Sequence, residues 1–295
     1  MVGGDPDRSA RFGPWAGGRT DIGVLVIVNE AAGSVGPGGR DKLLAEIEAL
    51  GARTTKSVSD LDQLCEGDAA NADLIVVLGG DGTASKAASM FSNGPPLVLL
   101  PGGTRNLLPR ALYGTLAWPD ALRAVLEHGR VAKLSGGEAN GRKFFVAAMF
   151  GAPTLLARAR EAARSGKFDL MVSRLKQVFA RLFARRIAVR PLGGLAARAE
   201  AAGVLCPAYR GEIEGQNLEW VRLNAAQIVD FVRVGVRSVI GGWREDPAIE
   251  LSSARSGEIR AIGTIPAVLD GEPMTFKRHV RVRMLTDGPK VLVTR

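Results

Sequence analysis

The sequence is poor in cysteine, histidine and aromatic residues, and each shortage excludes a class of protein. The 295 residues include two cysteines, Cys65 and Cys206, which are far apart and have no metal-ligand spacing. Such a pair is more typical of a reducing compartment than of a disulfide framework. With only His128 and His279, far apart in the sequence, no zinc-protease pattern is present. Aromatic residues make up 5% of the chain, which argues against a nucleic-acid partner, because single strands are bound by stacking on aromatic rings.

Long hydrophobic runs are also missing. No stretch of about 18 apolar residues is present, so the sequence predicts no membrane-spanning helix. Residues 1–20 are rich in Gly, Arg, Asp and Pro and have no apolar signal-peptide core. We therefore expect a disordered leader and a cytoplasmic protein.

Positive charge is in excess. The formal net charge is +9 and the sequence pI is about 10.1, while 46% of the residues are hydrophobic, as in a soluble globular protein. This balance indicates an anionic partner, such as a nucleotide or an acidic lipid surface.

Alternating strands and helices in the first part of the chain predict a parallel sheet. Apolar runs that read as buried strands occupy residues 22–28, 74–78 and 97–101, and a weaker strand is expected at residues 51–56. An amphipathic run over residues 41–50 predicts a helix between the first two strands. These patterns favour a Rossmann-like α/β nucleotide-binding domain over residues 21–130.

The remainder, residues 131–295, reads as a β-rich domain. Short segments with alternating hydrophobicity, clearest at Val280-Arg281-Val282-Arg283-Met284, predict an antiparallel, sandwich-like architecture. Whether the chain end returns to the first domain is left open. Two helices are expected within this domain, at residues 226–240 and 170–187.

The helix expected at residues 170–187 is basic and amphipathic. Met171, Leu175, Val178 and Leu182 share one face, and seven basic residues with no acidic one lie between residues 170 and 199. Two interpretations stay open together: a core-packing helix with a solvated basic face, and a helix that contacts an anionic membrane surface. The second would make the protein peripheral at the inner membrane surface.

A glycine turn follows the third strand. Gly79-Gly80-Asp81-Gly82-Thr83 joins the buried strand to a helix for which Thr83 is the expected cap. In this context backbone N–H groups can hold phosphate. A carboxylate beside phosphate is repulsive unless a cation bridges the two, so Asp81 suggests Mg²⁺ with a nucleotide. Taken alone, the segment is equally compatible with a plain strand-to-helix turn.

This turn is one of three motifs that together resemble a known family. The others are Pro101-Gly102-Gly103-Thr104-Arg105-Asn106 and Leu269-Asp270-Gly271-Glu272-Pro273. Their order and spacing are similar to those of the diacylglycerol kinase catalytic-domain family, which includes bacterial lipid kinases, sphingosine kinases and ceramide kinases. A Walker P-loop is absent, because Gly166-Lys167 is followed by Phe168 and not by Ser or Thr. The dinucleotide-binding fingerprint is absent as well, because Ser85 stands where its last glycine is required.

The resemblance implies transfer of the ATP γ-phosphoryl group to a lipid hydroxyl, such as that of diacylglycerol, in an active site between the two domains. It implies that Glu272 is the general base with Asp270 beside it, and that Asp81 takes part in catalysis with Mg²⁺. The nucleotide-binding positions that it implies are Asn29 to Gly33 in the first loop, Thr55 (or Thr54) after the second strand, Gly79, Gly80, Asp81, Gly82, Thr83 and Ser85 in the main loop, and Thr104 with Asn106 after the fourth strand.

Three positions depart from the family pattern. Glu30 stands where an Asn-Pro pair is usual and adds a negative charge near the expected phosphate site. Ala152 stands in place of an acid after Phe150-Gly151, and Gly215 aligns with the aspartate of a Mg²⁺-associated turn, leaving only Glu214 nearby. These changes concern a secondary metal site and the identity of the substrate.

Two alternatives remain. NAD kinases share the Gly-Gly-Asp-Gly turn, which keeps a soluble-substrate kinase open, although Pro101 to Asn106 favours the lipid-kinase branch. A non-catalytic nucleotide- or lipid-binding regulator is suggested by Ala152 and Gly215. A homodimer is also left open.

Overall fold

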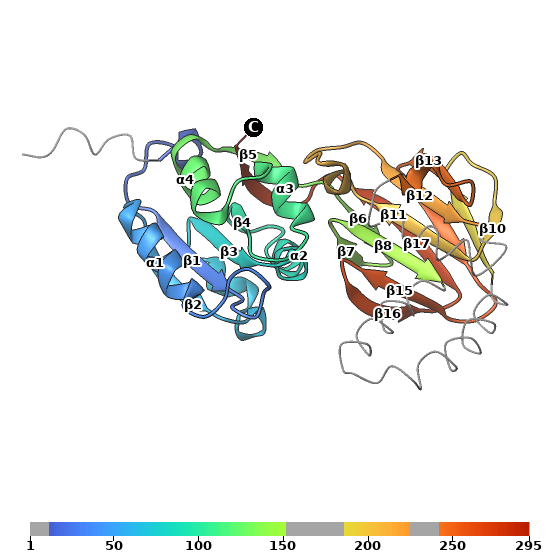
Figure 1. Cartoon of the computed structure of the whole chain (residues 1–295), viewed down its shortest axis with the longest axis horizontal. Helices are drawn as coiled ribbons and strands as arrows, with labels where there is room; N and C mark the ends of the chain where they lie inside the picture. The colour runs from blue at the N-terminus through green and yellow to red at the C-terminus, as the bar shows by residue number, and fades with distance from the viewer. Residues whose placement is uncertain (1–11, 152–185, 225–241, 295) are drawn as a thin grey trace, which may run out of the picture. The chain divides into compact units, whose positions relative to one another are not determined.

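The structure, a computed structural model, describes residues 12–151, 186–224 and 242–294. The chain forms two compact units (Figure 1). Unit 1 comprises Met1–Gly136, Pro207–Gly215 and Leu285–Arg295, and unit 2 comprises Gly137–Cys206 and Gln216–Met284. The division differs from a single boundary near residue 130, because two later segments belong to unit 1.

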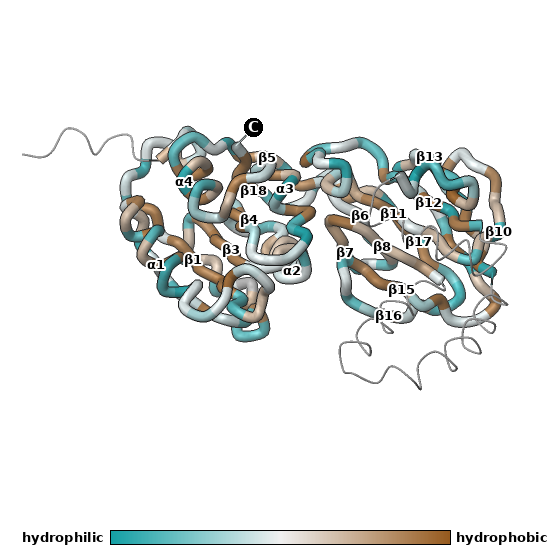
Figure 2. Tube along the Cα trace, viewed as in Figure 1, coloured by the Kyte–Doolittle hydropathy of each residue, from teal (hydrophilic) through white to brown (hydrophobic). Residues whose placement is uncertain are grey.

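Sheet A forms the centre of unit 1 and is mostly parallel. Its strand order is β2-β1-β3-β4-β18-β5, with β5 antiparallel to β18 and the other pairs parallel. The strands are β1 (Gly23–Val28), β2 (Arg53–Val58), β3 (Leu74–Gly79), β4 (Leu97–Pro101), β5 (Arg130–Lys133) and β18 (Lys290–Val293). Every residue of β1 and β3 is buried, and both strands are hydrophobic along their length (Figure 2). Central strands covered on both faces require this composition.

Helices cover sheet A. They are α1 (Gly39–Ala49), α2 (Asp81–Met90), α3 (Leu107–Tyr113) and α4 (Trp118–His128). Helix α1 contacts β1 and β2, α2 contacts β3 and β4, and both α3 and α4 contact β4. Short 3₁₀ turns are η2 (Pro14–Ala16), η3 (Leu61–Gln63), η4 (Glu66–Ala69) and η5 (Pro207–Arg210). The Rossmann-like α/β prediction is thereby confirmed.

Two polar side chains accept hydrogen bonds from backbone N–H groups of sheet A. The N–H of Leu99 in β4 donates to the hydroxyl oxygen of Tyr113 at 3.0 Å, and burial raises the pKa of Tyr113 above its usual range. At the amino end of β3, Asp73 accepts from the Gly23 N–H at 2.8 Å and pairs with Arg19. Burial alone would raise the pKa of Asp73, but these two donors hold it below its usual range.

Unit 2 contains two antiparallel sheets, as predicted. Sheet B has the order β10-β9-β14-β17-β6-β7 and sheet C the order β13-β12-β11-β8-β15-β16. The strands of sheet B are β6 (Gly136–Ala139), β7 (Arg142–Phe144), β9 (Ile187–Pro191), β10 (Ala197–Ala199), β14 (Ser256–Arg260) and β17 (His279–Leu285). Those of sheet C are β8 (Ala147–Gly151), β11 (Ala201–Leu205), β12 (Leu218–Leu223), β13 (Ile249–Ala254), β15 (Ile265–Leu269) and β16 (Glu272–Phe276), and η6 (Trp243–Glu245) precedes β13.

The core of unit 2 lies between these sheets. Phe144, Phe150, Trp220, Ile259 and Val282 belong to one buried cluster drawn from both. The Trp220 indole N–H donates to the Ala254 carbonyl at 3.2 Å, so the largest buried side chain keeps its polar atom satisfied. Along β9, β14 and β17, buried residues alternate with more exposed ones, which separates an apolar inner face from a polar outer face.

Some sequence-based expectations differ from the structure, and others concern residues outside the described ranges. The strand expected at residues 131–134 is β5, which belongs to sheet A rather than to the β-rich unit, because it pairs with the C-terminal strand β18. The helices expected at residues 170–187 and 226–240 fall on residues outside the described ranges, except that Ile187 begins β9. In the described part of the chain, no helix combines the length and apolar character needed to cross a membrane.

Candidate functional site: the glycine-rich loops of unit 1 and the Asp-Gly-Glu hairpin of unit 2

Three loops that follow β1, β3 and β4 lie together at the carboxyl edge of sheet A. The Asn29 N–H donates to the Leu78 carbonyl at 2.9 Å, which joins the first loop to the end of β3. The Gly102 N–H donates to the Gly79 carbonyl at 2.8 Å, and the Ser34 N–H donates to the Gly102 carbonyl at 3.0 Å. Ligands of open parallel sheets bind at this edge, where strand ends meet.

Glycine is required here because the loop backbones touch. A Cβ at Gly102 would lie 3.0 Å from the Gly79 nitrogen, and a Cβ at Gly103 would lie 2.7 Å from the Gly80 Cα. Neither distance accommodates a side chain without moving backbone. The glycines after β3 and β4 thus let the second and third loops pack against each other.

Side chains tie the loops together further. The Asn29 amide donates to the Thr83 hydroxyl at 3.1 Å. A Cβ at Gly33 would lie 3.1 Å from the Thr104 hydroxyl oxygen, so these two positions are neighbours. Residues from all three loops, separated by up to 75 positions in sequence between Asn29 and Thr104, therefore form one surface.

Asn106 and Asp81 fix the ends of two helices at this surface. Asn106 has φ +50° and precedes α3, and its side chain both accepts from the Gly103 N–H at 2.7 Å and donates to the Gly103 carbonyl at 2.8 Å. Asp81 is the first residue of α2, and its Oδ1 accepts from the Leu108 N–H in the first turn of α3 at 3.0 Å. The carboxylate thereby satisfies an amide that α3 leaves without an intrahelical partner.

The first turn of α2 is open toward solvent. Gly80 is the N-cap, and a Cβ at Gly82 would meet no atom within 4 Å. Thr83 lies in this first turn, so the helix begins two residues before the expected cap. Backbone N–H groups at a helix start carry partial positive charge and can bind phosphate oxygens.

Two of the expected nucleotide-binding residues lie elsewhere. Thr55 is inside β2, not after it, and its hydroxyl donates to the Val24 carbonyl at 3.0 Å within sheet A. This geometry uses the hydroxyl inside the sheet, and it does not favour contact with a ligand at the carboxyl edge. Ser85 lies in the second turn of α2 and is buried, with 6% of its surface exposed.

The extra acid of the first loop has a partner in the structure. Glu30 Oε1 accepts from the Arg40 N–H at 3.1 Å, in the first turn of α1. The Arg40 guanidinium in turn donates to the hydroxyl and the carbonyl of Ser57 at 3.0 Å each. Because an anion at a helix N-terminus is favourable, Glu30 is stabilised by α1 and its charge is partly compensated there.

In unit 2, Asp270 and Glu272 lie on the hairpin between β15 and β16. Leu269 pairs with Glu272 across a two-residue turn in which Asp270 has φ +47° and Gly271 φ +94°. Two consecutive positive φ values define the turn type that suits the twist of a hairpin. Glu272 is exposed at the start of β16.

Asp270 anchors this hairpin to the bend between β7 and β8. Its carboxylate accepts from three successive backbone N–H groups, those of Phe145 at 2.6 Å, Val146 at 2.9 Å and Ala147 at 2.8 Å. Its own N–H donates to the Ala147 carbonyl at 2.9 Å. Asp270 is therefore a positioning residue that holds the turn carrying Glu272.

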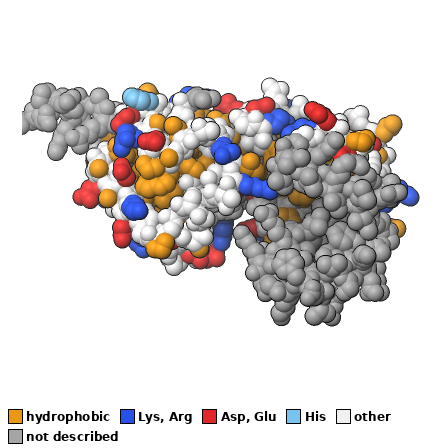
Figure 3. Space-filling model, in the orientation of Figure 1, with side chains coloured by type: hydrophobic (Ala, Val, Ile, Leu, Met, Phe, Trp, Pro, Cys, Tyr) orange, Lys and Arg blue, Asp and Glu red, His pale blue; other side chains and the backbone are white. Residues whose placement is uncertain are grey.

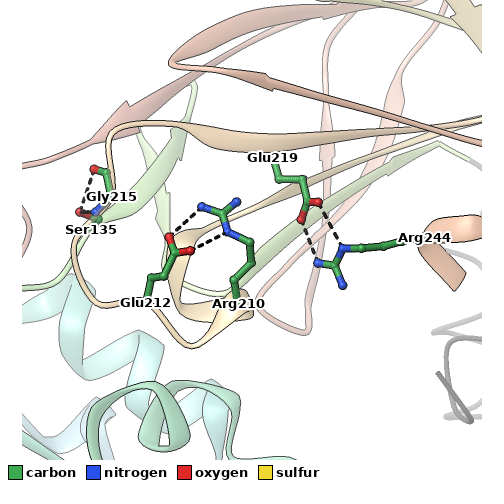
Figure 4. Close-up of polar contacts among 6 residues, drawn as sticks. All are labelled: Ser135, Arg210, Glu212, Gly215, Glu219 and Arg244. Atoms are coloured by element: carbon green, nitrogen blue, oxygen red, sulfur yellow. Dashed lines mark hydrogen bonds and ion pairs between the residues drawn. The ribbon is translucent and has the colours of Figure 1, made fainter. Parts of the chain in front are cut away.

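The segment aligned with the Mg²⁺-associated turn has no room for an acid at residue 215. A Cβ at Gly215 would lie 2.5 Å from Cγ of Pro207. The Gly215 N–H donates to the Ser135 hydroxyl at 3.1 Å, and Glu214 accepts from the Lys133 N–H at 3.3 Å. Figure 4 shows the contact between Gly215 and Ser135, together with the Arg210–Glu212 and Arg244–Glu219 ion pairs. Ala152 falls outside the described residues.

Sequence reasoning missed the acceptor roles of Asp81, Glu30 and Asp270 toward backbone amides. Only Glu30 carried a local signal, since it precedes a glycine-rich helix start by nine residues. The contact between Asp81 and Leu108 joins α2 to α3, and no sequence pattern indicates that these two helices are close in space.

Comparisons with known proteins agree with the motifs. The family model described as the diacylglycerol kinase catalytic domain matches residues 23–137, which confirms the resemblance for the part of the chain that carries the three loops. A search by sequence among curated proteins finds no match.

Solved structures resemble the whole chain. A crystal structure of a diacylglycerol kinase from Bacillus anthracis str. Sterne has a TM-score of 0.65 and 17% identity, and the alignment covers 92% of this chain and 97% of that one. A second structure from the same organism, provisionally named a diacylglycerol kinase, has a TM-score of 0.67 and 20% identity with the same coverage. A third, also provisionally named, has a TM-score of 0.65 and 18% identity, with 92% and 96% covered. At these identities the likeness concerns the fold.

Proposed function

Taking as premise that residues 23–137 match the diacylglycerol kinase catalytic domain, we propose that this chain is an ATP-dependent lipid kinase. It transfers the γ-phosphoryl group of ATP to a hydroxyl group of diacylglycerol or a related lipid. The observation that carries the proposal is the joining of three loops, after β1, β3 and β4, around the open start of α2.

Unit 1 supplies the phosphate-binding side. Gly80 and Gly82 leave the first turn of α2 accessible, so its N–H groups can approach phosphate oxygens. Asn29, Gly33 and Thr104 line the same surface from the neighbouring loops. Phosphoryl transfer depends mainly on such positioning and on neutralisation of phosphate charge.

Asp81 is the residue that would hold Mg²⁺. Its Oδ1 is engaged by the Leu108 N–H, which leaves its second carboxylate oxygen for a cation. Among the described residues, no three His, Cys, Asp or Glu side chains come together as a metal site. A carboxylate acting with substrate phosphates suits Mg²⁺, which commonly binds in this way and neutralises phosphate charge during transfer.

Glu272 supplies the base. In the proposed reaction the lipid hydroxyl oxygen forms a bond to the γ-phosphorus, the bond between that phosphorus and the β–γ bridging oxygen breaks, and ADP leaves. The hydroxyl proton passes to the Glu272 carboxylate, which is exposed on its hairpin and free of a structural role in the described residues. Asp270 keeps the hairpin in place through the Phe145 to Ala147 amides.

The acceptor lipid places the reaction at a membrane surface. We propose that the protein is cytoplasmic and peripheral at the inner membrane surface, with the basic segment at residues 170–187 contacting anionic lipid. That segment lies almost entirely outside the described residues, and the proposal for it rests on sequence.

The test is to incubate the protein with ATP and Mg²⁺ together with either a total lipid extract or NAD, and to identify phosphorylated products by mass spectrometry. A phosphorylated lipid is the expected product. Phosphorylation of NAD alone would assign the chain to soluble-substrate kinases. ATP binding without any phosphorylated product would instead support a non-catalytic regulator.

A further inference from the structure

The outer face of sheet B, in unit 2, is basic. We use this name for the outward side chains of Arg190, Arg198, Arg260, Arg281, Arg283, Glu138 and Glu258. Residues that alternate with them, such as Val189, Ile259 and Val282, are at most 1% exposed, so the strand pleat separates the two sets. Arg260, Arg281 and Arg283 have side-chain exposures of 63%, 77% and 67%.

Strand register places these side chains side by side. Arg190 on β9 and Arg281 on β17 both lie opposite Glu258 on β14. Arg260 lies opposite His279 on β17 and Ala188 on β9. The face therefore presents cations from three adjacent strands, which lie about 4.8 Å apart.

The two acids do not neutralise the face. Glu258 pairs with Arg260 at 2.7 Å, Arg281 at 3.6 Å and His279 at 3.5 Å, and the hydrogen bond from Arg260 lowers the pKa of Glu258. Glu138 pairs with Arg283 at 2.9 Å. Five arginines against two glutamates leave an excess of three positive charges. On the face of unit 1 drawn in Figure 3, by contrast, basic and acidic side chains are interspersed.

Exposed aliphatic side chains lie at both ends of this face. Leu192 and Leu195, in the loop between β9 and β10, are 70% and 90% exposed. Leu192 follows Arg190 by two residues, the spacing of residues on the same face of a strand. Its N–H donates to the Ser256 carbonyl of β14 at 2.8 Å. At the opposite end of β14, Ile262 follows Arg260 by two residues and is 94% exposed.

We propose that the outer face of sheet B, with the Leu192–Leu195 loop and Ile262, binds the surface of an anionic lipid bilayer. Arginines would pair with lipid phosphates, while the aliphatic tips enter the headgroup region. The described residues of this face and its two loops include no aromatic side chain, which disfavours single-stranded nucleic acid. This inference deepens the proposed function and rests on it for its purpose, since a lipid kinase must meet its substrate at a bilayer.

The experiment is co-sedimentation of the full chain with vesicles of equal parts phosphatidylcholine and phosphatidylglycerol, and with vesicles of pure phosphatidylcholine. Two variants alter the face: Arg281→Gln with Arg283→Gln, and Leu192→Ser with Leu195→Ser. The matched control, Arg53→Gln with Arg123→Gln, removes the same charge from unit 1, where these side chains are 64% and 50% exposed. All variants retain residues 170–187, so differences report on the outer face of sheet B, and circular dichroism verifies that each folds.

The expected result is binding to the anionic vesicles that weakens with added salt. Each arginine contributes about fivefold in affinity, so the double arginine variant should bind about 25-fold more weakly. The leucine variant should bind at least about tenfold more weakly, and the control within about twofold of wild type. Equal binding by folded face variants and wild type would overturn the proposal. So would equal affinity for the two vesicle types, or duplex DNA that binds the face while vesicles do not.

A kinase assay separates this proposal from the proposed function. The substrate is a short-chain diacylglycerol dissolved as monomers without vesicles. Face variants that phosphorylate it like wild type while losing vesicle binding support both proposals. Product formation with unchanged vesicle binding overturns the docking surface alone. Vesicle binding that follows the expected pattern, with no lipid product from wild type, overturns the proposed function alone.

Discussion

Replacing Asp270 by Asn should destabilise the hairpin that carries Glu272. The Asp270 carboxylate accepts three backbone N–H groups, two on Oδ1 from Val146 and Ala147 and one on Oδ2 from Phe145. Asn keeps one acceptor oxygen for the first two groups, but its NH₂ group would face the Phe145 N–H, donor against donor. Asn tolerates the positive φ of this position, so the turn itself adds little cost.

The expected loss of unfolding free energy follows from the hydrogen bonds to the Asp270 carboxylate that the substitution weakens or removes. A hydrogen bond to a charged group contributes about 1.5–3 kcal/mol, and a buried N–H left without a partner costs about 1–3 kcal/mol. Because this site is only partly buried, water recovers some of the loss, and we expect about 2–4 kcal/mol in the free energy of unfolding. At an m-value of about 2 kcal/mol/M in urea, the midpoint should fall by about 1–2 M.

Urea denaturation and amide hydrogen exchange provide the assay. Exchange of the Phe145, Val146 and Ala147 amides should accelerate in Asp270→Asn, since their acceptor is weakened. Glu272→Gln is the matched control on the same hairpin, and its exposed side chain should change stability by no more than about 0.5 kcal/mol. An unchanged urea midpoint together with unchanged protection of the three amides would refute the anchoring role of Asp270.

Four further substitutions test unit 1. Gly103→Ala would place a Cβ 2.7 Å from the Gly80 Cα and should weaken ATP binding at least about fivefold by calorimetry, whereas Gly82→Ala, which meets open space, should not. Tyr113→Phe leaves a buried β4 amide without its acceptor and should cost about 1–3 kcal/mol in thermal unfolding. The pKa of Asp73 is lower in the folded protein than in the unfolded chain, so its stabilising contribution is complete above the unfolded pKa and lost as pH falls through the folded pKa. Urea midpoints of wild type and Asp73→Asn should therefore differ at neutral pH and converge in acid.

Much of unit 1 could be predicted because its signals are local. Continuous apolar runs such as residues 74–78 permit few structures other than a strand buried on both faces. The glycine turn after that strand is equally local, and Gly79 to Asp81 lie where the pattern placed them, at the carboxyl edge of sheet A.

Contacts between distant segments were beyond sequence reasoning. The second strand was expected over residues 51–56, but β2 runs over Arg53–Val58, since register with β1 decides where the strand ends. The strand β18 is only four residues long and joins sheet A through pairing with β5. Hydropathy does not report which of two sheets a short strand will enter.

The Asp-Gly-Glu segment shows both kinds of information. Its Asp-Gly pair is a local hairpin signal, and the structure has a hairpin there, with the pair as the turn between β15 and β16. The three amides that the Asp270 carboxylate binds lie more than 120 residues earlier in the chain, as the separations of 123 to 125 residues record. Only the folded sheet brings that acceptor and those donors together.

We propose that unit 1 holds ATP and that Glu272 accepts the proton of a lipid hydroxyl. The most direct test is transfer of γ-labelled phosphate from ATP to extracted lipid by wild type and by Glu272→Gln, with ATP binding measured in parallel. We predict labelled lipid with wild type, loss of at least about 100-fold in transfer with Glu272→Gln, and equal ATP binding by the two proteins. Equal transfer by Glu272→Gln and wild type would contradict the proposal.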